Sequence, residues 1–107
     1  MTYSMICSRN DVILLPIPFT DLTSQKVRPA VVIGVSGADL LLVPISSQLA
    51  NTDFELLHWQ AAGLNVSCGV KAQLASVAHK RVIKIVGKLH PIAVETLNKR
   101  LRSWLQL

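Results

Sequence analysis

The sequence has little of what builds disulfide frameworks, zinc sites or membrane spans. Its 107 residues include only two cysteines, Cys7 and Cys68, which form no CxxC pair and have no paired histidines near them. We therefore expect no metal site and no disulfide, but two reduced thiols in a cytoplasmic protein. The apolar run at 12–19 is too short to cross a bilayer, so no membrane segment is expected.

Acidic residues and the signatures of common enzymes are also scarce. Eleven Lys and Arg face only six Asp and Glu, and the second half, 56–107, has eight bases and Glu95 as its single acid. Such a balance favours a polyanionic partner. The sequence contains no Gly-rich phosphate loop, no HExxH or GxSxG motif and no close pair of carboxylates, so no cofactor is expected.

Apolar residues, by contrast, are abundant. Half of the chain is hydrophobic and 16% is charged, which is typical of a folded protein. The length predicts one domain, residues 1–107. For so short a chain, this apolar excess favours a surface patch that a second copy covers, so we expect a homodimer.

Runs of apolar residues predict several short strands followed by one helix. The strand candidates lie at 12–17, 29–35, 39–45, 54–57, 66–77 and 82–88. Lys84 and Lys88 are expected on one side of the last strand. The helix begins at Pro91 and repeats apolar residues at spacings of three and four, at Val94, Leu97, Leu101 and Trp104. This order predicts a mainly β fold, a small barrel with the helix packed on it.

The hairpin formed by 29–35 and 39–45 places two polar residues side by side. If 36–38 is a three-residue loop, Arg28 lies opposite Ser46; a two-residue loop makes the partner Ser47. An arginine fork grips a phosphate through two hydrogen bonds, and a hydroxyl adds a third, which suits metal-free RNA cleavage by the neighbouring 2′-OH. In the alternative interpretation, Arg28 pairs with Asp21 or caps the sheet edge and the serines start a turn.

Other polar residues carry weaker signals. The segment 20–26 is polar and rich in turn formers, so it predicts a surface loop of a kind that often carries function. The three histidines, His58, His79 and His90, are scattered and are expected to be structural or solvated. In the alternative interpretation, His58 beside Trp59 serves as a general acid or base. Phe19, at the mouth of the loop, is expected either in the core or stacked on a base.

Four stretches together resemble the MazF/PemK family of toxin ribonucleases, from about Asp11 to the C-terminus. They are DVILLPIPFTDL from Asp11, KVRPAVVI from Lys26, LVPISSQ from Leu42, and IVGKLHP from Ile85. The resemblance implies an SH3-like barrel of five to seven strands in a cytoplasmic homodimer. It also implies a toxin that cleaves single-stranded mRNA at specific sequences without a metal, leaving a 2′,3′-cyclic phosphate, and an antitoxin partner with an acidic tail.

Carried over position by position, the resemblance makes Arg28 and Ser46 the catalytic residues. The family more often has threonine where Ser46 stands, and serine keeps the oxygen. The loop between the first two strands, which the family uses as a lid at the RNA site, corresponds to 19–26. We expect RNA contacts from Phe19, Thr20, Asp21, Lys26, Ser47, Gln48 and Lys71.

One departure from the family leaves two alternatives open. Many members have an acidic residue and an arginine in a strand reading like RCDQ, whereas 70–73 of this chain reads VKAQ and has no Asp near Ala72. The chain is then either a nuclease with another proton acceptor or a weak or inactive module that binds RNA or an antitoxin. A relative with the same barrel poisons gyrase, so a gyrase-poisoning toxin is a third hypothesis.

Overall fold

Seven strands and one α-helix make up the part of the chain that the computed structural model describes, residues 6–17 and 26–107. The predicted site residues Phe19, Thr20 and Asp21 lie outside these residues. The elements are β1 (Asp11–Ile17), β2 (Lys26–Ser36), β3 (Asp39–Ser46), β4 (Phe54–Glu55), β5 (Gly69–Val70), β6 (Ala75–Ala78), β7 (Lys84–Lys88) and α1 (Pro91–Leu105), with short 3-10 helices η1 (Leu49–Asn51) and η2 (His79–Arg81). The prediction of a mainly β fold with a C-terminal helix is confirmed.

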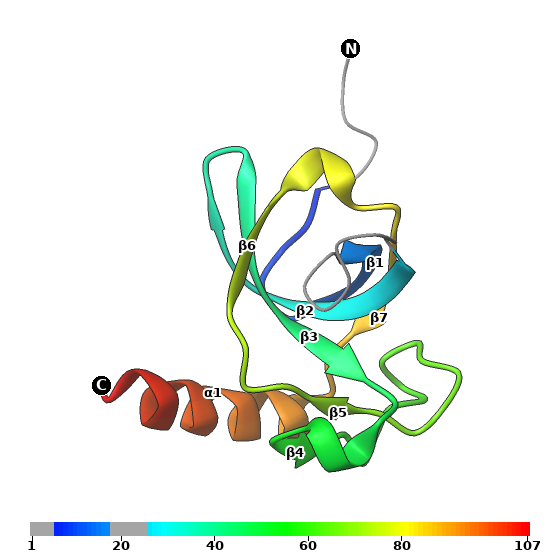
Figure 1. Cartoon of the computed structure of the whole chain (residues 1–107), viewed down its shortest axis with the longest axis vertical. Coiled ribbons are helices and arrows are strands. Elements are labelled where there is room, and N and C mark those ends of the chain that lie inside the picture. Colours follow the sequence, from blue (N-terminus) through cyan, green and yellow to red (C-terminus); the bar gives the residue numbers. More distant parts are fainter. Residues whose placement is uncertain (1–5, 18–25) are drawn as a thin grey trace.

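The strands form one antiparallel sheet with the order β4-β5-β3-β2-β1-β7, and β6 pairs with β3 outside this path. The strand β3 changes neighbours along its length: Asp39 to Leu42 pair with β6, whereas Ile45 and Ser46 pair with β5. The sheet therefore curls strongly, and α1 lies across its lower end beside β4 and β5 (Figure 1).

Both faces of the central strands are buried. One core combines Val12, Val31 and Val43 with Leu97 and Leu101 of α1. The other lies on the opposite face and is built from Cys7, Ile13, Leu15, Ala30, Val32, Leu40 and Leu42. Strands covered on both sides need apolar residues at every position, which explains the continuous apolar runs of the sequence.

The tip of the β2–β3 hairpin shows which of the two predicted loop lengths forms. Ser36 pairs directly with Asp39, so the connection is a two-residue turn, in which Gly37 has a φ of +60°. Glycine adopts this backbone without steric cost. Of the two loop lengths that the sequence left open, the two-residue loop is therefore the one that forms. A bulge between Val32 and Gly34 then shifts the register by one residue, and Ala30 pairs with Pro44, as the three-residue loop would have given.

The start of β2 and the register of β7 differ from the prediction. Lys26, expected in the loop, is the first residue of β2 and pairs with Ile17. In β7 a register shift occurs opposite Val12 and Ile13, so that Lys84 pairs with Leu14 and Lys88 with Asp11. Leu14 and Asp11 are an odd number of residues apart and point to opposite faces. The prediction that the two lysines share one side is wrong.

The helix α1 follows its predicted pattern. Pro91 occupies the first turn, and the Nδ1 atom of His90 accepts a hydrogen bond from the backbone N–H of Ile92 at 3.1 Å, which caps the helix. Its inner face is confirmed: Leu97 and Leu101 are buried, and Trp104 packs half-buried against the same core.

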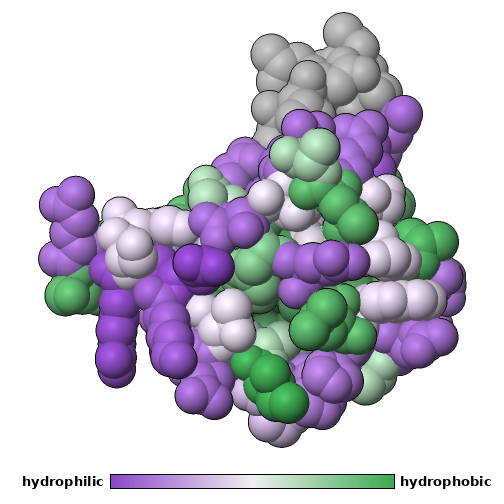
Figure 2. Space-filling model, turned by 90° about the horizontal axis from the view of Figure 1, so that it is seen from below, coloured by the Kyte–Doolittle hydropathy of each residue, from purple (hydrophilic) through white to green (hydrophobic). Residues whose placement is uncertain are grey.

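The surface is mixed in polarity. Seen from below, hydrophilic side chains project along α1, and a group of apolar side chains lies to the right of the helix (Figure 2). Leu57, Val66 and Ile92 are among the large apolar residues exposed in the described chain. No helix within 6–17 and 26–107 is long and apolar enough to cross a membrane.

Candidate functional site

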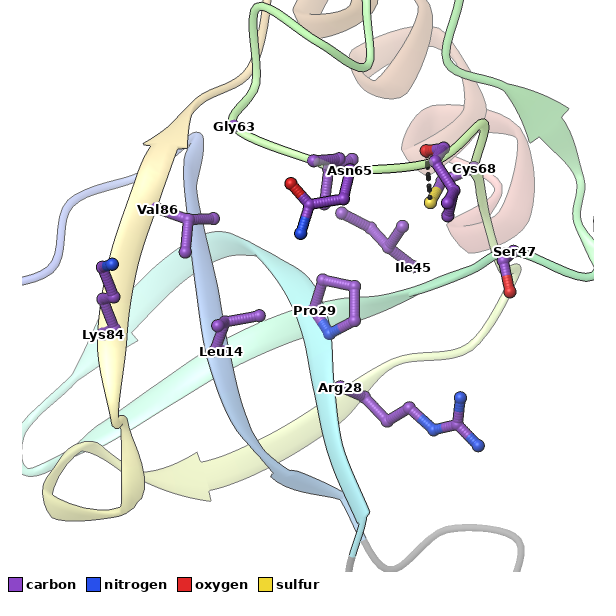
Figure 3. A pocket seen from close by; sticks show the side chains of 12 residues that line it. Leu14, Arg28, Pro29, Ile45, Ser47, Gly63, Asn65, Cys68, Lys84 and Val86 are labelled. Atoms are coloured by element: carbon purple, nitrogen blue, oxygen red, sulfur yellow. Dashed lines mark hydrogen bonds between the residues drawn. The ribbon is translucent and has the colours of Figure 1, made fainter.

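A pocket of about 430 Å³ opens at the end of the sheet where the β2–β3 ladder stops. Strands β1, β2, β3 and β7 form one side of it, and the segment 63–68 forms the other (Figure 3). Its floor is apolar and consists of Leu14, Pro29, Ile45 and Val86. Its polar lining residues are Arg28, Ser47, Asn65 and Lys84.

The sheet register explains why the floor is apolar. Leu14 pairs with Pro29, two residues beyond the Val12–Val31 pair on the same strands. Because side chains alternate between faces along a strand, this pair continues the core that Val12 and Val31 share with Val43. The pocket is thus the open end of the core between the sheet and α1.

Arg28 and Ser46 lie at the same level of the sheet. The ladder between β2 and β3 ends at Ala30 and Pro44, and Arg28 and Ser46 each stand two residues beyond that last pair. The two strands then separate because Ile45 and Ser46 pair with β5 instead. Arg28 is exposed, and its guanidinium extends from the rim of the pocket (Figure 3).

Ser46 and Ser47, at the end of β3, have different surroundings. The half-buried Ser46 accepts a hydrogen bond through Oγ from the backbone N–H of Gln48, at 3.1 Å, as expected for a residue that starts a turn. Its hydroxyl proton remains available to a further acceptor. Ser47 is exposed and lines the pocket together with Arg28. Gln48 accepts a hydrogen bond from Asn51 Nδ2 at 2.9 Å and so belongs to the same turn.

The two other predicted lysines take different positions. Lys26 is exposed at the start of β2, two residues before Arg28. Lys71 lines a second hollow of about 350 Å³, together with Asp53 and Gln73. The structure therefore does not bring Lys71 into the pocket of Arg28.

Two polar residues of the pocket are not among the predicted site residues. Asn65 follows the turn at 59–63, and its amide points into the hollow; Lys84 lies on β7 at the opposite end of the floor from Arg28 (Figure 3). The sequence signal for this side of the pocket is Gly63. It has a φ of +86° and lies so close to the Val86 carbonyl that a Cβ atom would clash. The glycine brings the turn against β7 and sets the position of Asn65.

Among the described residues, the cysteine and histidine side chains discussed next add neither a nucleophile nor a metal cluster. Burial raises the pKa of the Cys68 thiol, which lines the pocket and donates to the Val66 carbonyl, so it is protonated at neutral pH. The rings of His58 and His90 stack on each other with centroids 3.8 Å apart. Across the described ranges, no three His, Cys, Asp or Glu residues gather where they could hold a metal ion.

Comparison with known proteins gives one match that covers most of the chain. A family model described as a PemK-like, MazF-like toxin of type II toxin-antitoxin systems matches residues 8–105. The matched span contains the whole sheet and the pocket. None of the curated proteins compared with the chain matches it.

Proposed function

Because the chain belongs to the family of PemK-like and MazF-like toxins of type II toxin-antitoxin systems, we propose that it is an endoribonuclease that cleaves single-stranded mRNA. The observation that carries this proposal is the position of Arg28 at the rim of the pocket, level with Ser46 and beside Ser47. A guanidinium and one or two hydroxyls at the mouth of an apolar hollow suit a phosphodiester whose neighbouring groups enter the hollow.

The proposed reaction needs only charge and orientation from these residues. The RNA 2′-oxygen passes its proton to solvent and forms a bond to phosphorus. The bond from phosphorus to the 5′-oxygen breaks, and that oxygen takes up a proton from water. The products are a 2′,3′-cyclic phosphate and a free 5′-hydroxyl. Arg28 binds the two non-bridging oxygens and stabilises the charge that develops on them, and the Ser46 or Ser47 hydroxyl donates a further hydrogen bond.

The first experiment measures cleavage of a mixed pool of single-stranded RNA in EDTA. Wild type is expected to cleave, Arg28→Ala to lose at least about a hundredfold in rate, and Arg28→Lys to lose most activity because it lacks the fork. Ser46→Ala and Ser47→Ala are compared separately, and whichever variant loses more activity identifies the hydroxyl that acts. Lys99→Ala, on the exposed side of α1, is the control. An unaffected Arg28→Ala variant would refute the assignment.

A second candidate function is a module that binds RNA or an acidic antitoxin segment without cleaving RNA. No carboxylate or histidine is found among the described residues that line the pocket, so no proton acceptor for the 2′-OH is assigned there. Salt-sensitive RNA binding with no product after hours would favour this candidate.

The family implies an antitoxin partner. We propose that the protein is a cytoplasmic homodimer and that the antitoxin inhibits this homodimer. Exposed apolar residues such as Val35, Leu41 and Leu74 supply surface that a second copy can cover. Light scattering after size-exclusion chromatography tests the dimer. A monomer at all concentrations up to about 100 µM would contradict it, since stable dimers bind more tightly than that.

A further inference from the structure

We propose that the pocket holds one unstacked nucleobase of the RNA, that Asn65 reads the edge of this base, and that Lys84 binds the phosphate on the far side from Arg28. This inference rests on the proposed function, because it assigns a part of the same substrate to the hollow beside Arg28. Three observations support it.

The first observation is the apolar floor. Leu14, Pro29 and Val86 form a surface without charged groups between the two cations (Figure 3). A phosphate gains nothing from such a surface, whereas the flat face of a base is well covered by it. The middle of the pocket therefore suits a base and its ends suit phosphates.

The second observation is the spacing of the two cations. Lys84 pairs with Leu14 across the sheet, and Leu14 pairs with Pro29, so one row crosses β7, β1 and β2. Neighbouring strands lie about 4.8 Å apart, which separates the backbones at Lys84 and Pro29 by roughly 10 Å. Arg28 directly precedes Pro29. Arg28 pairs with Leu15, so its side chain leaves β2 on the face opposite the floor and meets the pocket only at its rim. Lys84 on the face of the floor and Arg28 at the rim therefore stand at opposite ends of this row, where they can bind the phosphates on either side of one nucleoside.

The third observation is the amide of Asn65. An Asn side chain offers both donors and an acceptor in one plane, which matches the adjacent donor and acceptor groups on the edge of a base. Its loop is held by hydrogen bonds from the backbone N–H groups of Gly63 and Leu64 to the carbonyls of Gln60 and Trp59, at 3.0 and 3.1 Å. Asn65 is therefore the specificity-determining residue of this subsite.

An NMR titration with small probes tests the inference without requiring cleavage. The probes are the four nucleoside 5′-monophosphates and ribose 5-phosphate, which has the same phosphate and sugar but no base. We expect at least one nucleotide to shift the amide signals of 63–66 and to bind about tenfold more tightly than ribose 5-phosphate. Equal binding of ribose 5-phosphate would overturn the inference, and so would shifts with an acidic peptide but with no nucleotide.

Matched variants assign the two roles. Asn65→Ala is expected to weaken nucleotide binding about tenfold and to leave ribose 5-phosphate unchanged, whereas Lys84→Ala weakens both. Gln73→Ala, at the second hollow, and Lys80→Ala, on η2, are the controls. An Asn65→Ala variant that binds nucleotides like wild type would overturn the role given to Asn65.

Cleavage of a random RNA pool separates this inference from the proposed function. Asn65→Ala is expected to cleave a changed set of sequences, while Arg28→Ala cleaves none. If wild type cleaves no RNA but binds nucleotides through Asn65, the proposed function fails and the base pocket stands. If wild type cleaves RNA and Asn65→Ala leaves both the sequence set and nucleotide binding unchanged, the base pocket fails and the nuclease stands.

Discussion

Trp104 near the end of α1 donates its indole N–H to Asp53 Oδ2 at 3.0 Å, although the two residues lie 51 positions apart. The other oxygen of Asp53 lies 3.0 Å from Arg100 Nε. One carboxylate thereby ties the last turns of the helix to the segment that leads into β4. The Asp53 side chain is 24% exposed and accepts from two side chains at once, so this contact anchors the helix more firmly than an isolated surface ion pair would.

Asp53→Ala is therefore expected to lower the free energy of unfolding by about 1 to 2 kcal/mol, since both Trp104 and Arg100 lose their acceptor. Urea denaturation measures the change. Asp53→Asn, which keeps an acceptor oxygen but not the charge, is expected to lose less. Glu95→Ala removes only an exposed pair to Lys99 at 3.9 Å and serves as the control, with a loss of no more than about 0.5 kcal/mol. Equal losses for Asp53→Ala and Glu95→Ala would contradict the anchoring role.

The pair Asp11–Lys88 predicts an asymmetry between its two members. Asp11 is buried and accepts from the Ser8 backbone N–H at 2.8 Å as well as from Lys88 Nζ at 3.0 Å, whereas the Lys88 side chain is mostly exposed. Asp11→Ala is expected to cost about 2 kcal/mol, because the Ser8 N–H loses its acceptor in a partly buried contact and Lys88 loses its counter-charge. Lys88→Ala is expected to cost about 1 kcal/mol or less. A larger loss for Lys88→Ala in thermal or urea unfolding would show that this ranking is wrong.

His90 has two structural roles that substitution can separate. It caps α1 through Nδ1, and its ring stacks on His58. His90→Ala removes both and is expected to cost about 1 kcal/mol or more, whereas His58→Ala removes only the stacking and costs less. His90→Asn restores a capping side chain without an imidazole ring and should recover most of the loss. If His90→Asn is as unstable as His90→Ala, capping does not contribute.

The buried thiols predict how stability changes at alkaline pH. Burial raises the pKa of Cys68, and burial followed by the negative charge of Asp11 raises the pKa of Cys7. The unfolded chain loses these protons near the ordinary thiol pKa of about 8.5, while the folded chain keeps them to higher pH. The thiol contribution to stability is thus complete below about pH 8 and declines as the pH rises further. Urea unfolding from pH 7 to 10 is expected to show a steeper decline for wild type than for Cys68→Ala; parallel curves would contradict this.

The hairpin illustrates how far the sequence determines the sheet. The apolar runs on both sides of 36–38 were sufficient to predict β2, β3 and their pairing. The bulge between Val32 and Gly34 is marked in the sequence by Gly34 alone. A glycine within a strand indicates a bulge but does not say how the register shifts, because that depends on how the strand bends over its neighbours. The prediction that Arg28 lies opposite Ser46 assumes a three-residue loop. The observed loop has two residues, and the bulge shifts the register by the one residue that restores this alignment. The same kind of irregularity in β7 separated Lys84 from Lys88.

The pocket was predictable only on its strand side. Arg28 and Ser47 follow from the ends of strands that the sequence marks clearly. Asn65 depends on a turn that packs Trp59, Ala62 and Leu64 against the core. Gly63 lets this turn approach β7, which is far away along the chain, so no local pattern records the contact. Lys71 was assigned from its place in a motif, but β5 carries it toward Asp53 and Gln73 instead.

The exchange of neighbours along β3 makes the two ends of the hairpin independent. Its tip, at Gly37, is exposed, while the pocket opens where β3 leaves β2. A turn of different length changes the register of β2 and β3 at the tip. A matching change in the bulge between Val32 and Gly34 restores the register before Arg28. Evolution and engineering can therefore remodel this tip, for example to change what docks there, without disturbing the chemistry at the other end.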